Sequence, residues 1–324
     1  MKTKQQFLML GIIAMMASCS SDNSVSDTEE KVPIQIFCSS SKISTRAANV
    51  AANLQDEQFA TGSKMNIYLT KTGTNTPIGT NQYNEFTVGN SYAGISGALE
   101  LATTATDLYY PSDGTGVDAY ALYPSVFGSS NTKLENTTNE FTVKTDQTSD
   151  ENYKKSDLMY AWKENTPRAN NPIELEFNHC MSKVIVELVP GNGVNTSELA
   201  NASIKMKAVA TATITQNTTS TPYTVTAAAK DGEPVSDIQL GDYDTTNGSA
   251  VIIVPQTISS GNEIFQVKIG SGTYKCTAGV DRIFEAGKVH KYTLTVQSTG
   301  VVVVSVKIKD WGDGNDYSDN AELQ

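Results

Sequence analysis

The run "HKYTLTVQSTGVVVVSVKIKDW", residues 290–311, decides the fold class. β-branched and aromatic residues fill both of its halves, and such residues are enriched in strands. It predicts two strands, Lys288–Val296 and Val301–Ile308, and the intervening "QSTG" is typical of a hairpin with a short glycine-containing loop. Alternation along the second strand predicts one apolar face, made of Val302, Val304, Val306 and Ile308.

Short runs of the same kind occur along the rest of the chain, among them "KVIVELVPG", "SAVIIVPQTI", "MNIYLT", "VDAYALYP" and "IELEFNHC". Gly, Asn, Asp, Ser or Pro separates them, and apolar patterns of helical period are scarce. We therefore expect an all-β protein. Because the mature chain is too long for one sandwich of about 100 to 150 residues, two are expected, 47–172 and 173–324, joined near "NTPRANNP" at residues 165–172.

The N-terminus has the features of a lipoprotein signal peptide, residues 1–19. Lys2 and Lys4 precede the apolar run "FLMLGIIAMM", and small residues then lead to Cys19. A cysteine at a new N-terminus can be acylated, so a lipid on Cys19 would hold the precursor on a membrane. The following "SSDNSVSDTEEK" is polar and acidic, as expected of a flexible tether.

A short strand is predicted just after this tether, because Val32, Ile34, Ile36 and Cys38 recur at every second position. Beyond it lies "SKISTRAANV", residues 41–50, in which Arg46 is the only arginine and small, uncharged residues stand directly on both sides of it; Lys42 is the other charge of this stretch. Two interpretations are open. Either a protease cuts between Arg46 and Ala47 and removes residues 20–46, or Arg46 is an ordinary loop charge.

Composition excludes several classes of function. The formal net charge is −11, the pI is about 4.7 and lysine and arginine do not cluster, which argues against nucleic-acid binding. His179 and His290 have neither metal-ligand nor triad spacing, and no nucleotide-binding motif is present. We expect no catalysis, no metal and no cofactor.

The cysteines after the signal peptide are Cys38, Cys180 and Cys276, an odd number without metal-ligand spacing. Buried free thiols are expected, although a bond between Cys180 and Cys276 stays open. The acidic "DWGDGNDYSD", residues 310–319, lacks the register of a calcium loop and is interpreted as a solvated tail. Four tyrosines could stack on sugar rings, but their places at strand ends favour capping of a sandwich core with the hydroxyl in water: Tyr109, Tyr110, Tyr120 and Tyr123.

Several of these runs occur in an order that resembles the fimbrillin, or Mfa-like, family: "FATGSKMNIYLT", "DLYYP", "VDAYALYP", "SDLMYAW", "LEFNHCMSKVIVEL", "VIIVPQTI", "FEAGKVHKYTLTV" and "VKIKDWGDG". The resemblance covers nearly the whole chain. It implies two transthyretin-like antiparallel β-sandwich domains in tandem. It also implies a lipoprotein precursor on the outer membrane of a Gram-negative bacterium, and a subunit of an adhesive type V pilus, or fimbria.

The resemblance also implies partners and site residues. An arginine-specific protease would cut after Arg46, and the strand carrying Val32, Ile34 and Ile36 would be displaced. A strand from another copy or a related subunit would take its place. The strand carrying Val302, Val304, Val306 and Ile308 would then either close its own domain or be donated. A surface ligand would be the target of adhesion. The alternative is a monomeric glycan-binding surface lipoprotein that keeps its strand and anchor.

Overall fold

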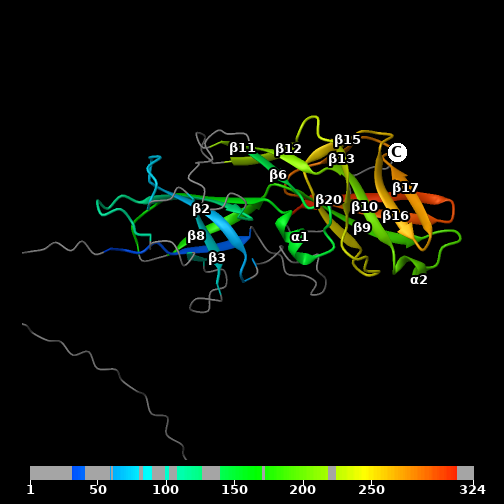
Figure 1. Cartoon of the computed structure of the whole chain (residues 1–324), viewed down its shortest axis with the longest axis horizontal. Helices are drawn as coiled ribbons and strands as arrows, with labels where there is room; N and C mark the ends of the chain where they lie inside the picture. The colour runs from blue at the N-terminus through cyan, green and yellow to red at the C-terminus, as the bar shows by residue number, and fades with distance from the viewer. Residues whose placement is uncertain are drawn as a thin grey trace, which may run out of the picture. The chain divides into compact units, whose positions relative to one another are not determined.

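The structure is a computed structural model that describes residues 31–40, 59, 61–79, 83–89, 99–101, 108–125, 139–169, 172–217 and 224–311. Cys19, Arg46 and Ala47 lie outside these residues, as does the tail after Trp311. The described chain belongs to one compact unit and consists mostly of strands, as predicted (Figure 1). Within it, no helix is long and apolar enough to cross a membrane.

The first sheet has seven strands in the order β1-β8-β7-β5-β2-β3-β4. Their bounds are β1 (Ile36–Ser40), β2 (Lys64–Lys71), β3 (Tyr83–Val88), β4 (Leu99–Leu101), β5 (Val117–Tyr123), β7 (Met159–Thr166) and β8 (Ile173–His179). All neighbours are antiparallel except β1 and β8, which run parallel. Residues 165–172, where the sequence suggested a linker between domains, thus connect two neighbouring strands of one sheet.

The rest of the described chain forms four smaller sheets. Two have four strands: β13 (Val235–Gln239), β10 (Ser203–Val209), β16 (Glu263–Ile269) and β17 (Gly272–Thr277), and then β14 (Ser249–Ile253), β9 (Ser182–Pro190), β19 (Lys288–Gln297) and β20 (Gly300–Asp310). The others are β12 (Thr224–Ala229), β11 (Thr211–Asn217) and β6 (Asn139–Thr142), and the pair β15 (Gln256–Ile258) and β18 (Arg282–Phe284). Because β9 and β19 are also parallel, the prediction of purely antiparallel sheets is wrong in two places.

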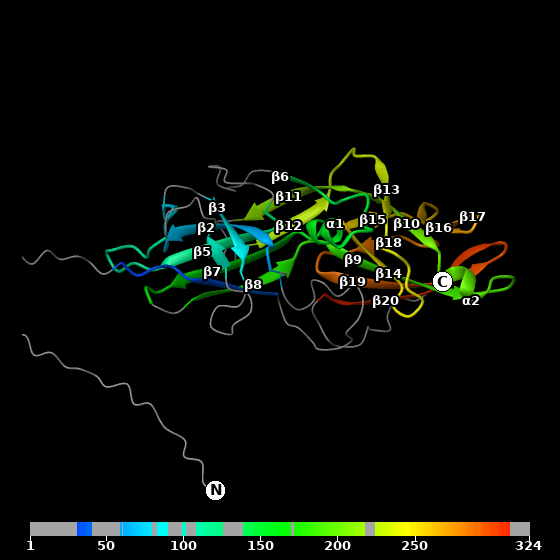
Figure 2. The same ribbon diagram turned by 60° about the horizontal axis from the view of Figure 1, so that its bottom comes forward.

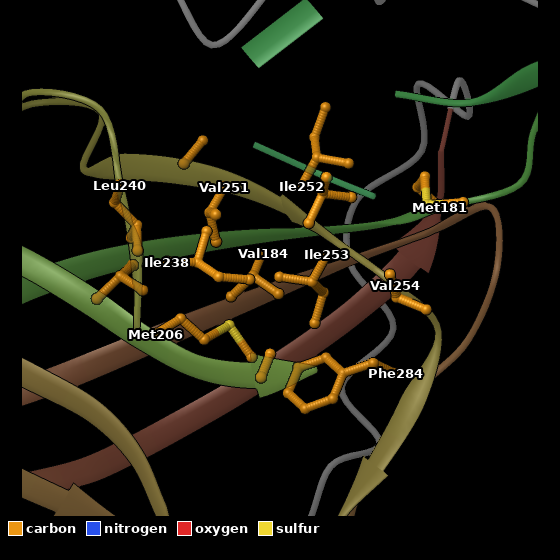
Figure 3. Packing of buried hydrophobic residues seen from close by; sticks show 14 of the residues in the cluster. Met181, Val184, Met206, Ile238, Leu240, Val251, Ile252, Ile253, Val254 and Phe284 are labelled. Carbon is orange, nitrogen blue, oxygen red and sulfur yellow. The ribbon is translucent and has the colours of Figure 1, made fainter. Parts of the chain in front are cut away.

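Buried side chains gather in two clusters. Cluster 1 lies on the seven-stranded sheet and includes Ile36, Ile67, Leu175 and Phe177. Cluster 2 is built mainly by the strands from β9 onward, and Figure 3 shows its packing around Val184, Met206, Val251 and Phe284. Neither cluster ends at residue 172. Strand β8 belongs to cluster 1, whereas residues on β6 and α1 (Asp150–Lys155) belong to cluster 2. A second short helix, α2 (Thr196–Leu199), follows β9.

The predicted hairpin at the C-terminal end is confirmed, since β19 and β20 pair along their lengths. Its predicted faces need correction. Thr293 pairs with Ser305 but Leu294 pairs with Val303, so β20 contains one extra residue, a β-bulge. The bulge shifts the alternation by one position. Val306 is buried and Ile308 packs against cluster 2, as predicted, but Val302 and Val304 are 55% and 48% exposed, and Val301 and Val303 face inward instead.

Candidate functional site

The N-terminal described segment, residues 31–40, adds a strand to the seven-stranded sheet. Strand β1 pairs with β8 from Ile36 opposite Ile173 to Ser40 opposite Phe177, and Figure 2 shows the dark blue β1 beside β8. The amide of Ile173 donates to the carbonyl of Gln35 at 2.7 Å. The C-terminal half of the segment is thereby fixed to the outer edge of β8.

A second part of the chain binds the same segment from residues 108–110. The amide of Ile34 donates to the carbonyl of Leu108 at 2.8 Å, and the amide of Tyr110 donates to the carbonyl of Val32 at 2.9 Å. Pro33 faces Tyr109 in an isolated bridge. The regular strand begins only at Ile36, later than predicted. The missing N–H of Pro33 costs no bond in this bridge, because Val32 and Ile34 on either side of it make the two hydrogen bonds. The sequence did not reveal that residues 108–110 contribute to this site.

The segment is part of cluster 1. Ile36 is 2% exposed and Cys38 is 7% exposed, while Val32 and Ile34 pack half-buried against the same cluster. The predicted alternation is therefore present. Phe37, which the alternation placed on the outer face, is buried as well. We call the space that residues 32–38 fill, along residues 108–110 and then along β8, the N-terminal slot.

The thiol of Cys38, which lies in the slot, is not a reactive group. Burial raises the pKa of the Cys38 thiol to about 12, so this thiol stays protonated and unreactive in the folded protein. Cys180 and Cys276 are also free and buried, and burial raises the pKa of each. The prediction of buried free thiols is confirmed for the three described cysteines.

The other candidate residues serve structure. His179 bonds to Asp157 and stacks on Trp311, so this histidine has a packing and hydrogen-bonding role. Burial, with a smaller effect of Lys288, lowers the pKa of His290 to about 4. No group of three or more acidic, histidine or cysteine side chains suited to a metal occurs in the described parts of the chain.

The four tyrosines do not form one exposed platform. Tyr110 and Tyr123 are buried at 4% exposure, whereas Tyr109 and Tyr120 are partly exposed. The hydroxyl of Tyr120 donates to Glu164 at 3.2 Å. The expectation of a hydroxyl in water is wrong for Tyr110, whose oxygen is buried without a hydrogen-bond partner.

Comparison with known proteins identifies similar chains. A model of the fimbrillin-like family matches residues 45–311. A candidate fimbrium subunit of Bacteroides uniformis, Fim1C, is 24% identical over 336 residues, covering 98% of this chain and 100% of that protein. A solved structure of a candidate cell adhesion protein from Bacteroides uniformis has a TM-score of 0.63 at 19% identity, covering 88% of this chain and 99% of that one. Another, from Bacteroides ovatus, has a TM-score of 0.57 at 16% identity, covering 86% and 97%.

Proposed function

Because the chain belongs to the fimbrillin-like family, a family of structural fimbrial and adhesion proteins and not of enzymes, we propose that it is a cell-surface fimbrial subunit that assembles by strand exchange. In this proposal the precursor is exported as a lipoprotein with its lipid on Cys19, and its sheets form two transthyretin-like domains. An arginine-specific protease cuts between Arg46 and Ala47. The cut frees residues 20–46, which include β1, and another subunit supplies the replacement strand.

The observation that supports this proposal most is the burial of the N-terminal slot. Removing β1 uncovers the pockets of Ile36 and Cys38, and a fully buried aliphatic side chain contributes about 1.5–3 kcal/mol. It also deprives the amides of Tyr110 and Ile173 of their acceptors, at about 1–3 kcal/mol for each amide that stays buried. A cut subunit would thus have an unpaired strand edge and an apolar slot, both of which favour pairing with a donor strand.

The slot sets requirements for a donor. A strand that reproduces the bonds of β1 must run parallel to β8 and place apolar side chains at alternate positions. Strand β20 meets the second requirement if it loses its bulge, since Val302, Val304, Val306 and Ile308 then share one face. In its own subunit the bulge leaves the first two of these valines in solvent.

Because these two valines are exposed in the subunit, substituting them can test whether β20 is donated. The double variant Val302→Glu/Val304→Glu changes two exposed side chains, so the monomer's unfolding free energy should change by only about 0.5 kcal/mol per site. As a donor in the slot, the same strand would have to bury two charges. We expect normal export and folding of this variant, but loss of polymers after proteolysis.

The matched control is Ser305→Glu/Lys307→Glu, which adds the same two side chains on the same strand. Ser305 and Lys307 are not buried in the subunit and would face away from the slot in a donated strand. This control should polymerise. Polymers of normal length from Val302→Glu/Val304→Glu would contradict donation of β20 through this face.

Proteolysis is tested separately by Arg46→Ala. The proposal expects wild-type polymers to begin at Ala47 and the variant to remain monomeric, full-length after Cys19 and lipid-anchored. N-terminal sequencing and mass measurement on cell-surface material provide the readout. Polymers of uncut Arg46→Ala protein would contradict the proposed maturation.

A further inference from the structure

The residue that follows β20, Trp311, is buried against the end of β8. Its ring stacks on the imidazole of His179, with ring centroids 3.8 Å apart and planes 5° apart. His179 is fixed in turn, because its Nδ1 lies 2.9 and 3.1 Å from the two carboxylate oxygens of Asp157. The His179 and Asp157 side chains are 2% and 0% exposed. Trp311 itself is 6% exposed.

Backbone bonds and charges hold the same end of the strand. The amide of Trp311 donates to the carbonyl of Gly287 at 2.7 Å, and the amide of Gly287 donates to the carbonyl of Met181 at 2.8 Å. The ammonium of the buried Lys183 lies 5.4 Å from the centre of the Trp311 ring. Lys288 pairs with Asp310 immediately before the tryptophan. The end of β20 is thus tied to the connection between β8 and β9.

The two ends of β20 differ in how they are held. At its start, a tight turn joins it covalently to β19, and its first half carries the bulge and two exposed valines. Its second half carries the buried Val306 and ends at the Trp311 stack. The turn keeps the start of β20 covalently attached to β19. The strand can therefore leave β19 only if its pairing opens from the Trp311 end.

We propose that Trp311, His179 and Asp157 form a latch that keeps β20 in its own subunit and that must open before β20 can be donated. The gating role rests on the proposed strand exchange, whereas the retention of β20 does not. The latch and the N-terminal slot share strand β8, since β1 pairs with β8 and His179 is the last residue of that strand. The three latch residues are far apart in sequence, and only the fold brings them together.

Retention is tested by hydrogen exchange on the folded, uncut monomer. Trp311→Ala should raise the exchange rate of β20 amides by at least about tenfold and leave the rates in β2 and β5 unchanged. Trp311→Phe, which keeps an aromatic ring, should give a smaller rise and provides a readout if the alanine variant folds poorly. The matched control is Trp162→Ala, which removes a ring stacked on Tyr160 at 5.6 Å and should not affect β20.

A double-mutant cycle tests whether the parts act together. If Trp311 is held through His179, then His179→Ala should also speed exchange in β20, and adding it to Trp311→Ala should produce little further change. Unchanged β20 exchange in both single variants would overturn the latch. So would an equal rise across the whole chain, because that would mark a general loss of stability.

Gating is tested by following assembly after proteolysis. Trp311→Ala subunits should polymerise faster than wild type, while Trp162→Ala subunits should match wild type. Faster exchange in β20 with an unchanged assembly rate would overturn the gating role. If no variant and no wild-type protein assembles after the cut, then the proposed function fails, and the exchange experiment on the monomer still decides whether the latch exists.

Discussion

At the scale of single residues, the two histidines lie in different environments. His179 has a carboxylate partner and an aromatic stack, whereas His290 is 1% exposed and its Nε2 has no hydrogen-bond partner. A buried imidazole without a partner favours its neutral form, because burial penalises the charge. This explains the direction of the pKa shift at His290.

His290 should make the protein less stable in acid. Above pH about 6.5 the imidazole is neutral in both the folded and the unfolded state, so it has no effect. Between pH 6.5 and about 4, the unfolded chain takes up a proton that the folded protein does not, so the free energy of unfolding falls as pH falls. The loss from this residue at pH 4.5 should be about 2–3 kcal/mol.

Denaturant unfolding of wild type and His290→Leu at pH 7 and pH 4.5 measures this effect. The leucine variant lacks the titrating group, so the difference in stability between the two pH values should be smaller by about 2–3 kcal/mol. Carboxylates titrate in both proteins and largely cancel in the comparison. Equal pH dependence in the two proteins would contradict the neutral, buried His290.

At the scale of elements, the sequence predicted where strands lie better than which side chains they bury. The hairpin from β19 to β20 was predictable, because the valine-rich run and the glycine turn are local features. The bulge was not predictable, because it depends on which residues of β19 lie opposite, and a shift by one residue exchanges the two faces. The same limit explains why Val302 and Val304 were placed on the wrong face.

The bulge predicts different results for two single-residue deletions in β20. Removing Val304 should allow Val303 and Ser305 to keep their partners in a regular ladder, so stability should be unchanged or higher. Removing Lys307 instead forces either Ser305 inward or Ile308 outward, at a cost of about 1.5–3 kcal/mol. Equilibrium unfolding of the two variants makes the comparison, and equal destabilisation would contradict the pairing described here.

At the scale of the whole molecule, the two buried clusters do not correspond to two consecutive halves of the sequence. The sequence predicted a division at residue 172 from prolines and asparagines, which also suit a loop between two paired strands. A long-range contact joins the residues near 147 to cluster 2: the amide side chain of Gln147 bonds to both the amide and the carbonyl of Ile252, at 2.8 and 2.7 Å. No local pattern reveals a contact between residues 105 positions apart.

Each cluster contains a buried cysteine whose labelling reports whether that cluster has opened: Cys38 belongs to cluster 1 and Cys276 to cluster 2. If β1 is a separable part of cluster 1, then placing a charge in its pocket should release β1 without unfolding cluster 2. Ile36→Asp should therefore increase maleimide labelling of Cys38 in the uncut precursor by about 100-fold, because the released thiol regains an ordinary pKa and solvent access. Cys276 should stay protected.

The control for this experiment is Gln35→Asp, which adds the same charge one residue earlier at an exposed position and should leave both thiols protected. Joint labelling of Cys38 and Cys276 in Ile36→Asp would mean that the clusters unfold together, and loss of β1 would then unfold the subunit. Labelling of Cys38 alone would mean that a subunit can lose this strand and keep most of its structure, which strand exchange between folded subunits requires.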